Sequence, residues 1–428
     1  MNKKFIGLVL LLAVVFVTAG CAGNQTGGEA TPTLEPTGTS AAPAETESGG
    51  APTQAADGQK PEPSCQVDPP LPTPNPTDEM LFAPDPEEDW IKGPEDARIT
   101  IVEYGDFQCP YCAEASRNLQ ELMEKYPDQI RLVYRHFPLD SIHDKAVLST
   151  QAAEAAGRQD AFWEMHDLLY AAQQEWSDLN PAAFTEWAAD QAEELGLDRE
   201  QFLEDMNSEQ IAAEAQQAWV KGQEIGLPGT PYLKINRVFE AQPDPVLLTT
   251  FVEMIKLNDQ QFNECPPMTL DEGAQYQAVL ETEKGDIVIE LFPETAPLAV
   301  NSFIFLAEND WFDQVTFHRV LEGFVAQTGD PSGTGYGGPG YSFGIESEPG
   351  LVFDRAGLVA LANSGPETNG SQFFITYSSA PSLNGQYTIF GEVIQGMDVA
   401  ESLTPRNPQE NPDAPPGDLL LDVTIEKE

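Results

Sequence analysis

The chain has 428 residues, a length that suits two or three domains. Its 70 acidic side chains outnumber its 21 basic ones and give a formal charge of −49 at pH 7. This excess of acid argues against nucleic acid as a partner, because phosphates are neutralised by clustered lysine and arginine. The apolar content of 41% is enough for packed cores, and the five cysteines cannot all pair within the chain.

The first 20 residues have the pattern of a secretory signal peptide. Lys3 and Lys4 precede an apolar run over residues 5–17, which is too short to span a bilayer comfortably and ends in small residues before Cys21. This ending resembles the bacterial lipoprotein signal, in which the cysteine is lipidated; a plain signal peptide with an incidental cysteine is the alternative. We therefore predict a signal peptide over 1–20, lipidation at Cys21, and an extracytoplasmic protein anchored at the cell membrane surface or on the periplasmic side.

Residues 21–86 have the composition of a disordered tether. From residue 22 to residue 86 there are 13 prolines, seven glycines and one aromatic side chain, Phe82. A segment with so little to bury cannot offset the entropy that it loses on ordering. The sequence therefore predicts a Pro/Gly-rich spacer between the anchor and the folded part of the chain.

The first folded domain is expected over residues 87–265. Its predicted strands and helices alternate, and a long helical region separates the second strand from the third. The expected strands are 99–104, 130–135 and 232–235, and the expected helical segments are 113–126, about 142–225, and 244–257. This order predicts an α/β domain with a large helical insertion.

A Cys-x-x-Cys motif, Cys109-Pro-Tyr-Cys112, follows the first of these strands and opens the first helix. The N–H groups and dipole of a helix N-terminus stabilise a thiolate, so Cys109 is predicted to be the reactive thiol and Cys112 the resolving one. Zinc binding and a purely structural disulfide are the alternatives, but zinc needs two further ligands. His136, His143 and His166 are scattered along the sequence, and we interpret them as packing or surface residues.

This region resembles the DsbA-like members of the thioredoxin superfamily. The resemblance rests on the segment 106–112 after a strand, on the helical insertion, and on Gly229-Thr-Pro231 before the third strand. It implies a thioredoxin-like fold with a redox-active Cys109–Cys112 disulfide and a cis peptide bond before Pro231, against the disulfide.

The resemblance also implies roles for two further residues. Thr230 would offer backbone hydrogen bonds to a substrate strand. Glu103, six residues before the first cysteine, would be a buried acid that takes the proton of the resolving thiol; an ordinary strand carboxylate is the equal alternative. The Pro-Tyr dipeptide of the motif differs from the Pro-His of the strongest oxidants, which leaves the direction of the redox reaction open.

Cys65 and Cys265 flank this domain, each among prolines. One lies in the tether and the other beside a connector over residues 266–275. We predict that they pair with each other; two free or intermolecular thiols are the alternative.

From residue 276 to residue 428 the pattern changes to short strands and glycine-rich loops. Strands are expected at 276–282 and 286–292, and a helix at 297–309. This pattern predicts an antiparallel β barrel with few helices. Residues 335–340 match the form G-x-G-x-x-G, but no helix pattern follows them, so we interpret them as a flexible loop and reject a dinucleotide site.

The second domain resembles the cyclophilins over about residues 276–426. The motifs that carry the resemblance occur in the family's order: Phe317-His-Arg319, Gly323-Phe-Val-Ala-Gln327, Ala362-Asn363, Asn369-Gly-Ser-Gln-Phe-Phe374, Leu383-Asn-Gly385 and Phe390-Gly-Glu-Val393. The implied activity is rotation about an X-Pro bond, whose barrier arises from amide resonance. A cation that donates to the prolyl nitrogen favours the twisted transition state, and the resemblance implies that Arg319 is this donor. An ordinary surface salt bridge is the alternative for Arg319.

The resemblance implies the rest of the isomerase site as well. The apolar pocket for the proline ring would be lined by Phe324, Val325, Phe374 and Leu383. The substrate would be held along a groove by Gln327, Ala362, Asn363, Gln372 and, at the rim, Tyr387. Tyr387 stands where many cyclophilins have His, and Ser382 where many have Trp, so the substrate preference is expected to differ.

Together the two resemblances imply an extracytoplasmic folding factor that combines thiol–disulfide oxidoreductase and peptidyl-prolyl cis–trans isomerase activities. The alternative is a redox domain that acts as a dedicated reductant, joined to a cyclophilin domain that binds peptides with little turnover. The expected partners are unfolded or folding exported polypeptides, a membrane redox partner, and the membrane itself through the lipid anchor. No cofactor, metal or nucleic acid is expected.

Overall fold

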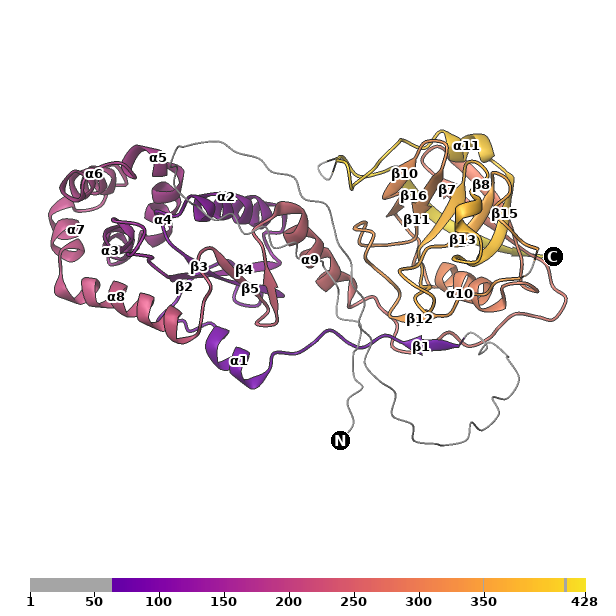
Figure 1. The fold of residues 1–428 in the computed structure, drawn as a ribbon, viewed down its shortest axis with the longest axis horizontal. Coiled ribbons are helices and arrows are strands. Elements are labelled where there is room, and N and C mark those ends of the chain that lie inside the picture. The colour runs from indigo at the N-terminus through magenta and orange to yellow at the C-terminus, as the bar shows by residue number, and fades with distance from the viewer. Residues whose placement is uncertain (1–63, 349, 412–413) are drawn as a thin grey trace, which may run out of the picture. The chain divides into compact units, whose positions relative to one another are not determined.

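The computed structural model describes residues 64–348, 350–411 and 414–428 (Figure 1). The predicted signal peptide, the predicted lipidation site Cys21 and the tether up to residue 63 lie outside the described residues. Among the helices of the described part, none is long and apolar enough to cross a membrane.

The first domain is built on a mixed sheet with the strand order β2-β4-β3-β5-β6. Its strands are β2 (Trp90–Lys92), β3 (Ile99–Gly105), β4 (Ile130–His136), β5 (Tyr232–Ile235) and β6 (Phe239–Ala241). The central strand β3 runs parallel to β4 and antiparallel to β5, and every one of its residues is buried. The strands predicted at 99–104, 130–135 and 232–235 are present, with ends that differ by at most one residue.

Two helices cover one face of this sheet (Figure 1). They are α2 (Pro110–Lys125) and α9 (Pro245–Leu257), and their apolar side chains join those of the strands in one core. Leu119 and Leu122 on α2 pack there with Leu248 and Val252 on α9. Because α2 starts directly after the loop that leaves β3, the core fixes the point at which the Cys-x-x-Cys motif begins.

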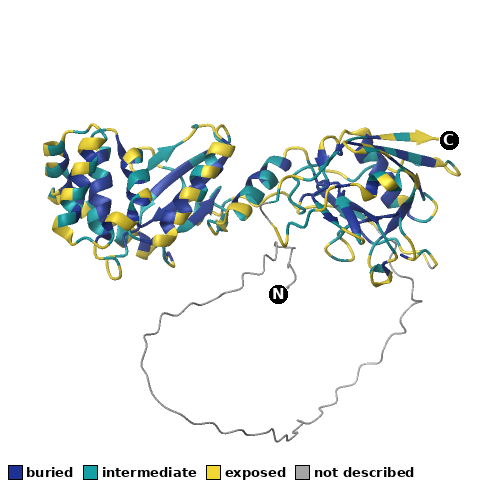
Figure 2. Ribbon diagram, turned by 90° about the horizontal axis from the view of Figure 1, so that it is seen from above, coloured by how far each residue is buried: buried dark blue, intermediate teal, exposed yellow. Residues whose placement is uncertain are grey.

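The predicted helical insertion is present between β4 and β5. Its helices are α3 (Ala146–Gly157), α4 (Phe162–Ala171), α5 (Gln173–Trp176), α6 (Pro181–Glu194), α7 (Arg199–Met206) and α8 (Glu209–Glu224). Their inner faces form a separate core around Trp176 and Phe184. In Figure 2 the helices of this domain carry both buried and exposed turns, as expected of helices with one face in a core. Phe107 and Cys112 belong to the same core. The insertion therefore packs against the start of α2.

Residues 64–86 are ordered, so the prediction of a disordered tether is wrong for this part. A helix, α1 (Pro76–Phe82), begins with Asn75 as its N-cap, whose side-chain oxygen accepts hydrogen bonds from the backbone N–H groups of Thr77 and Asp78. Phe82, the one aromatic residue of the segment, is buried against Tyr104 and Tyr232. The average composition of the segment gave no indication of this capped helix or of the contacts that its Phe82 ring makes.

The same stretch also contributes to the second domain. A short strand, β1 (Cys65–Val67), pairs antiparallel with β12 (Tyr341–Phe343). The structure joins Cys65 to Cys265 by a disulfide that spans a sequence separation of 200 residues. The whole first domain therefore lies within a covalent loop whose two ends are closed at the second domain.

The second domain is a curled antiparallel sheet in the order β10-β11-β14-β13-β15-β8-β7-β16-β9, a half-barrel (Figure 1). Its strands are β7 (Tyr276–Thr282), β8 (Gly285–Leu291), β9 (Val315–Thr316), β10 (Arg319–Leu321), β11 (Val325–Thr328), β13 (Leu358–Leu361), β14 (Phe373–Thr376), β15 (Ile389–Gln395) and β16 (Leu419–Lys427). The helix α10 (Pro297–Glu308) supplies Phe303, which packs with Phe373 and Phe390 in the main core. A short helix, α11 (Met397–Glu401), and a 3-10 turn (Pro381–Leu383) complete the domain.

Candidate functional sites

The thiol site lies at the loop between the end of β3 and the start of α2. Cys109 is the N-cap residue of α2, and Pro110 occupies the first helical turn, where its missing N–H costs nothing. The Cys109 carbonyl accepts hydrogen bonds from the N–H groups of Cys112 and Ala113. Within the described part of the chain Cys109 and Cys112 are free thiols, so the predicted Cys109–Cys112 disulfide is not formed and the structure describes the reduced state.

The two thiols have opposite electrostatic environments. A hydrogen bond with the Cys112 side chain, helped by further hydrogen bonds, lowers the pKa of Cys109 to about 6. Burial raises the pKa of Cys112 well above its usual range, and the nearby Cys109 and Glu103 raise it further. At neutral pH Cys109 is therefore largely a thiolate and Cys112 a neutral thiol, which is the division between an attacking and a resolving cysteine.

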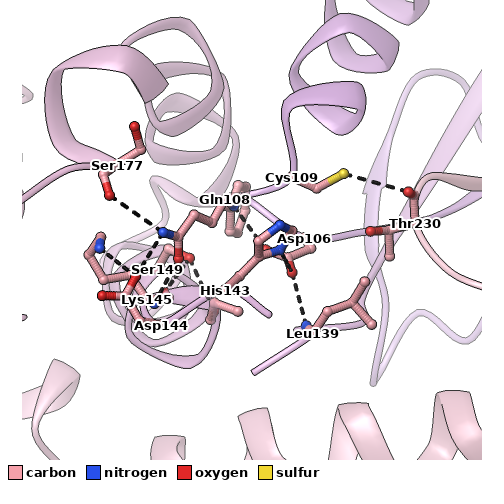
Figure 3. A network of polar contacts seen from close by, with 12 residues as sticks. Asp106, Gln108, Cys109, Leu139, His143, Asp144, Lys145, Ser149, Ser177 and Thr230 are labelled. Atoms are coloured by element: carbon pink, nitrogen blue, oxygen red, sulfur yellow. Dashed lines mark hydrogen bonds and ion pairs between the residues drawn. The ribbon is translucent and has the colours of Figure 1, made fainter. Parts of the chain in front are cut away.

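The loop before β5 approaches Cys109 from the other side. The Thr230–Pro231 peptide bond is cis, as the resemblance implies. In its protonated form the Cys109 thiol donates to the carbonyl oxygen of Thr230, which lies 3.5 Å from Sγ (Figure 3). Thr230 is thus brought to the thiol that we predict to be reactive, although it lies more than 100 residues away in sequence, and Pro231 follows it directly.

Glu103 is fully buried on the central strand β3. Neither of its carboxyl oxygens has a hydrogen-bond partner among the described residues. Burial raises the pKa of Glu103 to about 8, so the group is protonated at neutral pH. When Glu103 ionises, its negative charge raises the pKa of Cys112, and this coupling suits an acid that exchanges a proton with the predicted resolving thiol better than an ordinary strand carboxylate.

One histidine is tied to the loop that carries the thiols, which corrects the interpretation of all three as packing or surface residues. His143 Nδ1 lies 2.7 Å from Oδ2 of Asp106, the buried acid three residues before Cys109 (Figure 3). His136 instead faces Glu154, and His166 is buried beside Asp167. The spacing of these histidines in the sequence carried no sign of the difference, because the contact joins two loops from separate strands.

A side chain of the insertion also holds the thiol loop. Gln173 on α5 is buried, and its Nε2 donates hydrogen bonds to the carbonyl oxygens of Phe107 at 2.7 Å and Cys109 at 2.9 Å. No sequence pattern indicates this role, since a glutamine in a helix-rich region has no distinguishing neighbours.

The predicted isomerase residues come together on one face of the second sheet. Arg319 on β10 is opposite Gln327 on β11, and Gln327 is opposite Phe374 on β14. Directly opposite residues on neighbouring antiparallel strands present their side chains on the same face. The register therefore sets a guanidinium, an amide and an aromatic ring side by side.

An apolar cluster forms the floor of this face. Phe374 and Val325 are buried in it together with Phe353, whose ring stacks on that of Phe374 with centroids 6.0 Å apart. Further predicted residues are partly buried against the cluster: Phe324, Ala362, Leu383 and Tyr387. Tyr387 meets the Phe374 ring edge to face. A partly open apolar surface of this kind suits a proline ring, and Phe353 is a member that the sequence motifs did not reveal.

The polar residues of the site are fixed by a loop that we predicted to be flexible. Gln327 Nε2 donates to Oε1 of Gln372 at 2.9 Å, and Gln372 Nε2 donates to the carbonyl oxygens of Gly335 and Gly337. The buried carboxylate of Asp330 accepts hydrogen bonds from the N–H groups of the same two glycines. The prediction of a flexible loop is wrong, because these bonds make residues 335–337 the support for the two glutamines.

The side chain of Asn363 is hydrogen-bonded within the domain. Its side-chain amide donates to the carbonyl oxygen of Gln386 and to Oδ1 of Asn369, so it is already engaged. Its own backbone N–H and carbonyl make no hydrogen bond within the described residues. Any contact with a substrate backbone is therefore expected from the main chain of Asn363, just beyond the end of β13.

Arg319 is half-buried, and it has no ion-pair partner among the residues that the structure describes. Arg355, by contrast, is paired with Asp354 and Glu392 on the surface of the same domain. A surface salt-bridge residue would be expected to find an acidic partner easily in so acidic a domain. Because Arg319 has none among the described residues, its N–H donors are available.

Comparisons with known proteins agree with both domains. Residues 278–424 match the family model of cyclophilin type peptidyl-prolyl cis-trans isomerases, and residues 85–254 match a thioredoxin model. Peptidyl-prolyl cis-trans isomerase A of Mycobacterium tuberculosis is 44% identical over 158 residues, which are 33% of this chain and 87% of that protein. Peptidyl-prolyl cis-trans isomerase B of Streptomyces anulatus is 42% identical over 170 residues, 35% of this chain and 96% of that protein.

A crystal structure of a Cryptosporidium parvum cyclophilin type peptidyl-prolyl cis-trans isomerase is 36% identical, covers 36% of this chain and 99% of its own, and has a TM-score of 0.33. The chain belongs to the cyclophilin-type peptidyl-prolyl cis-trans isomerase family through its C-terminal domain, and a thioredoxin-like domain precedes that domain.

Proposed function

We propose that this protein is an extracytoplasmic, lipid-anchored folding factor that isomerises prolyl bonds and exchanges thiols with disulfides in exported polypeptides. The isomerase assignment rests on the register that sets Arg319, Gln327 and Phe374 on one face beside an apolar cluster. The similar proteins of Mycobacterium tuberculosis and Streptomyces anulatus support this assignment, because both are named peptidyl-prolyl cis-trans isomerases.

In the isomerase reaction no covalent bond is made or broken. The proline ring rests on the apolar cluster around Phe374, and the substrate backbone binds Gln327 and the main chain of Asn363. As the amide twists, its nitrogen loses resonance and becomes a hydrogen-bond acceptor for the Arg319 guanidinium. This contact is stronger in the twisted state than in either planar state, so it accelerates the rotation.

The redox assignment rests on the opposite ionisation of Cys109 and Cys112. In the oxidising direction a client thiolate attacks Cys109 of the Cys109–Cys112 disulfide, and Cys112 leaves and takes a proton. A second client thiolate then attacks the mixed disulfide and releases the Cys109 thiolate, so the client loses two electrons and the protein gains them. A disulfide on a membrane redox partner would take these electrons back. In the reducing direction the same steps run in reverse.

The proposed location agrees with the Cys65–Cys265 disulfide, since structural disulfides persist in oxidising compartments. The lipid anchor is a proposal from the sequence around Cys21. A mass spectrum of the mature N-terminal peptide from the natural host tests it: a diacylglyceryl modification on Cys21 is expected, and an unmodified N-terminus at another residue would contradict it.

Trapping with single-cysteine variants tests the redox function. In full-length Cys112→Ser the Cys109 thiolate still attacks a disulfide of a client peptide, but no resolving thiol remains, so we expect a mixed disulfide to accumulate on non-reducing gels. Cys109→Ser is the matched variant, and we expect at least a tenfold lower yield because the pKa of Cys112 is high and its thiol is buried. Equal yields from the two variants would contradict the assigned roles.

A further inference from the structure

The loop that carries Cys109 is organised by one buried carboxylate. Oδ1 of Asp106 accepts a hydrogen bond from the backbone N–H of Gln108 at 2.8 Å. Oδ2 accepts from the backbone N–H of Leu139 at 2.9 Å and from Nδ1 of His143 at 2.7 Å (Figure 3). The carbonyl oxygen of Asp106 accepts from the N–H of Cys109. Asp106 therefore connects the main chain at the reactive cysteine directly to His143.

A second bridge runs parallel to the first. The Gln108 side chain accepts a hydrogen bond from the backbone N–H of Lys145 at 2.7 Å and donates one to Asp144 Oδ1 at 2.9 Å. The Lys145 ammonium pairs with the same Asp144 carboxylate at 2.5 Å. The segment 139–145, which leaves β4, is thus fixed to the thiol loop on both sides of His143, and the imidazole has little freedom to turn away.

The charges around His143 favour its protonated form. The hydrogen bond to Asp106 is the largest cause that raises the pKa of His143, and the negative charges of Asp106, Cys109 and Asp144 raise it further against the effect of burial. The Lys145 charge is held by Asp144. Because electrostatic coupling between two sites is reciprocal, a Cys109 thiolate that favours the imidazolium is itself favoured by it.

We propose that His143 is a positioning residue of the thiol site: its imidazolium, held by Asp106 in the loop that carries Cys109, stabilises the Cys109 thiolate and so makes the Cys109–Cys112 pair more oxidising. This role rests on the proposed thiol–disulfide exchange. It differs from a purely structural role because the effect depends on the charge of His143 and is therefore confined to a pH window.

The window follows from the two titrations. Below the pKa of Cys109, about 6, the thiol is neutral and the imidazolium stabilises nothing. Above the raised pKa of His143 the imidazole is neutral. The stabilisation is therefore largest between these two values and fades on both sides. A side chain that only braced the loop would change the redox equilibrium at every pH.

The test is the reduction equilibrium of the full-length protein in glutathione buffers across pH 5 to 9. In His143→Asn the amide keeps a donor for Asp106 but carries no charge. A nearby opposite charge shifts a pKa by about one unit or more. We expect the equilibrium inside the window to move by up to about tenfold toward the disulfide form, about 30 mV more reducing. His143→Lys restores a cation, and we expect it to recover the oxidising poise and extend it to higher pH.

His136→Asn is the matched control, since His136 also faces an acid, Glu154, at 2.9 Å in the same domain. We expect it to follow the wild-type curve. A His143→Asn curve equal to wild type, or displaced equally at all pH values, would overturn the proposal. A wild-type protein that does not equilibrate with glutathione at any ratio would instead overturn the redox function on which it rests.

Discussion

Replacement of Arg319 by alanine is expected to lower kcat/KM for isomerisation of a prolyl peptide by about 10²- to 10³-fold, the usual cost of removing one preorganised donor from a transition state. The guanidinium is not engaged in an ion pair within the described residues, so its loss leaves no partner charge stranded and the fold should be unaffected. Arg319→Lys keeps the positive charge but lacks the planar guanidinium, so its kcat/KM should lie between those of Arg319→Ala and the wild type. The measurement is a protease-coupled or NMR exchange assay on one X-Pro peptide.

Arg355→Ala is the matched control for this experiment. Arg355 lies on the same domain, but its guanidinium is paired at the surface with Asp354 and Glu392 and is not assigned to the site. It should retain the wild-type rate. Equal rates for Arg319→Ala and wild type would remove Arg319 from the mechanism and favour a domain that binds peptides without turnover.

Glu103→Gln is expected to have two large and opposite effects. A buried acid whose pKa is about 8 is well matched to proton transfer near neutral pH, and general acid–base catalysis contributes about 10²- to 10⁴-fold. We expect resolution of the mixed disulfide by Cys112 to slow by about 10²-fold, and its pH profile to lose the inflection near pH 8. Stopped-flow mixing with a client disulfide measures it. Glu121→Gln, an exposed acid on the same helix as Cys112, should leave the rate unchanged.

The second effect is on stability. The pKa of Glu103 is raised from 4.5 to about 8 in the folded state, so the unfolded chain ionises first and the folded state loses stability as pH rises from 4.5 to 8. At pH 7 this cost is about 3 kcal/mol at 1.36 kcal/mol for each pKa unit. Glu103→Gln should raise the free energy of unfolding of this domain by up to this amount at pH 7 and by nearly nothing at pH 4.

Urea unfolding followed by tryptophan fluorescence tests this prediction, because five of the six tryptophans lie between residues 87 and 265. A variant less stable than wild type at pH 7, or a difference that does not change with pH, would mean that Glu103 is an ordinary strand carboxylate. The conflict between stability and rate is the reason to regard this acid as functional: a fold under selection for stability alone would place glutamine or an apolar residue there.

The main elements of both domains could be predicted from local patterns, because buried strands such as β3 and amphipathic helices such as α2 have clear periodicities. Residues 64–86 could not, since their order depends on partners elsewhere in the chain. The Phe82 ring packs against Tyr104 and Tyr232, and β1 pairs with β12. Local composition contains no information about such a partner.

The sites divide in the same way. Cys109 and Cys112 can be recognised in the sequence by their spacing and by their position at the start of a helix. Phe324 and Phe374 look like core residues in the sequence and are assigned only through family motifs, whereas the sheet register shows directly why Phe374 stands beside Arg319. His143 and Gln173 were missed because each meets the thiol loop through a contact between segments that no periodicity links.

Refolding of one reduced, unfolded secretory protein that needs both a disulfide and a prolyl isomerisation tests whether the chain has two independent folding activities. These two steps are separable in time as slow phases. The wild-type protein should accelerate both phases, Arg319→Ala only the disulfide phase, and Cys109→Ser only the proline phase. Acceleration of neither phase by the wild type, or loss of both accelerations in either variant, would contradict two independent activities.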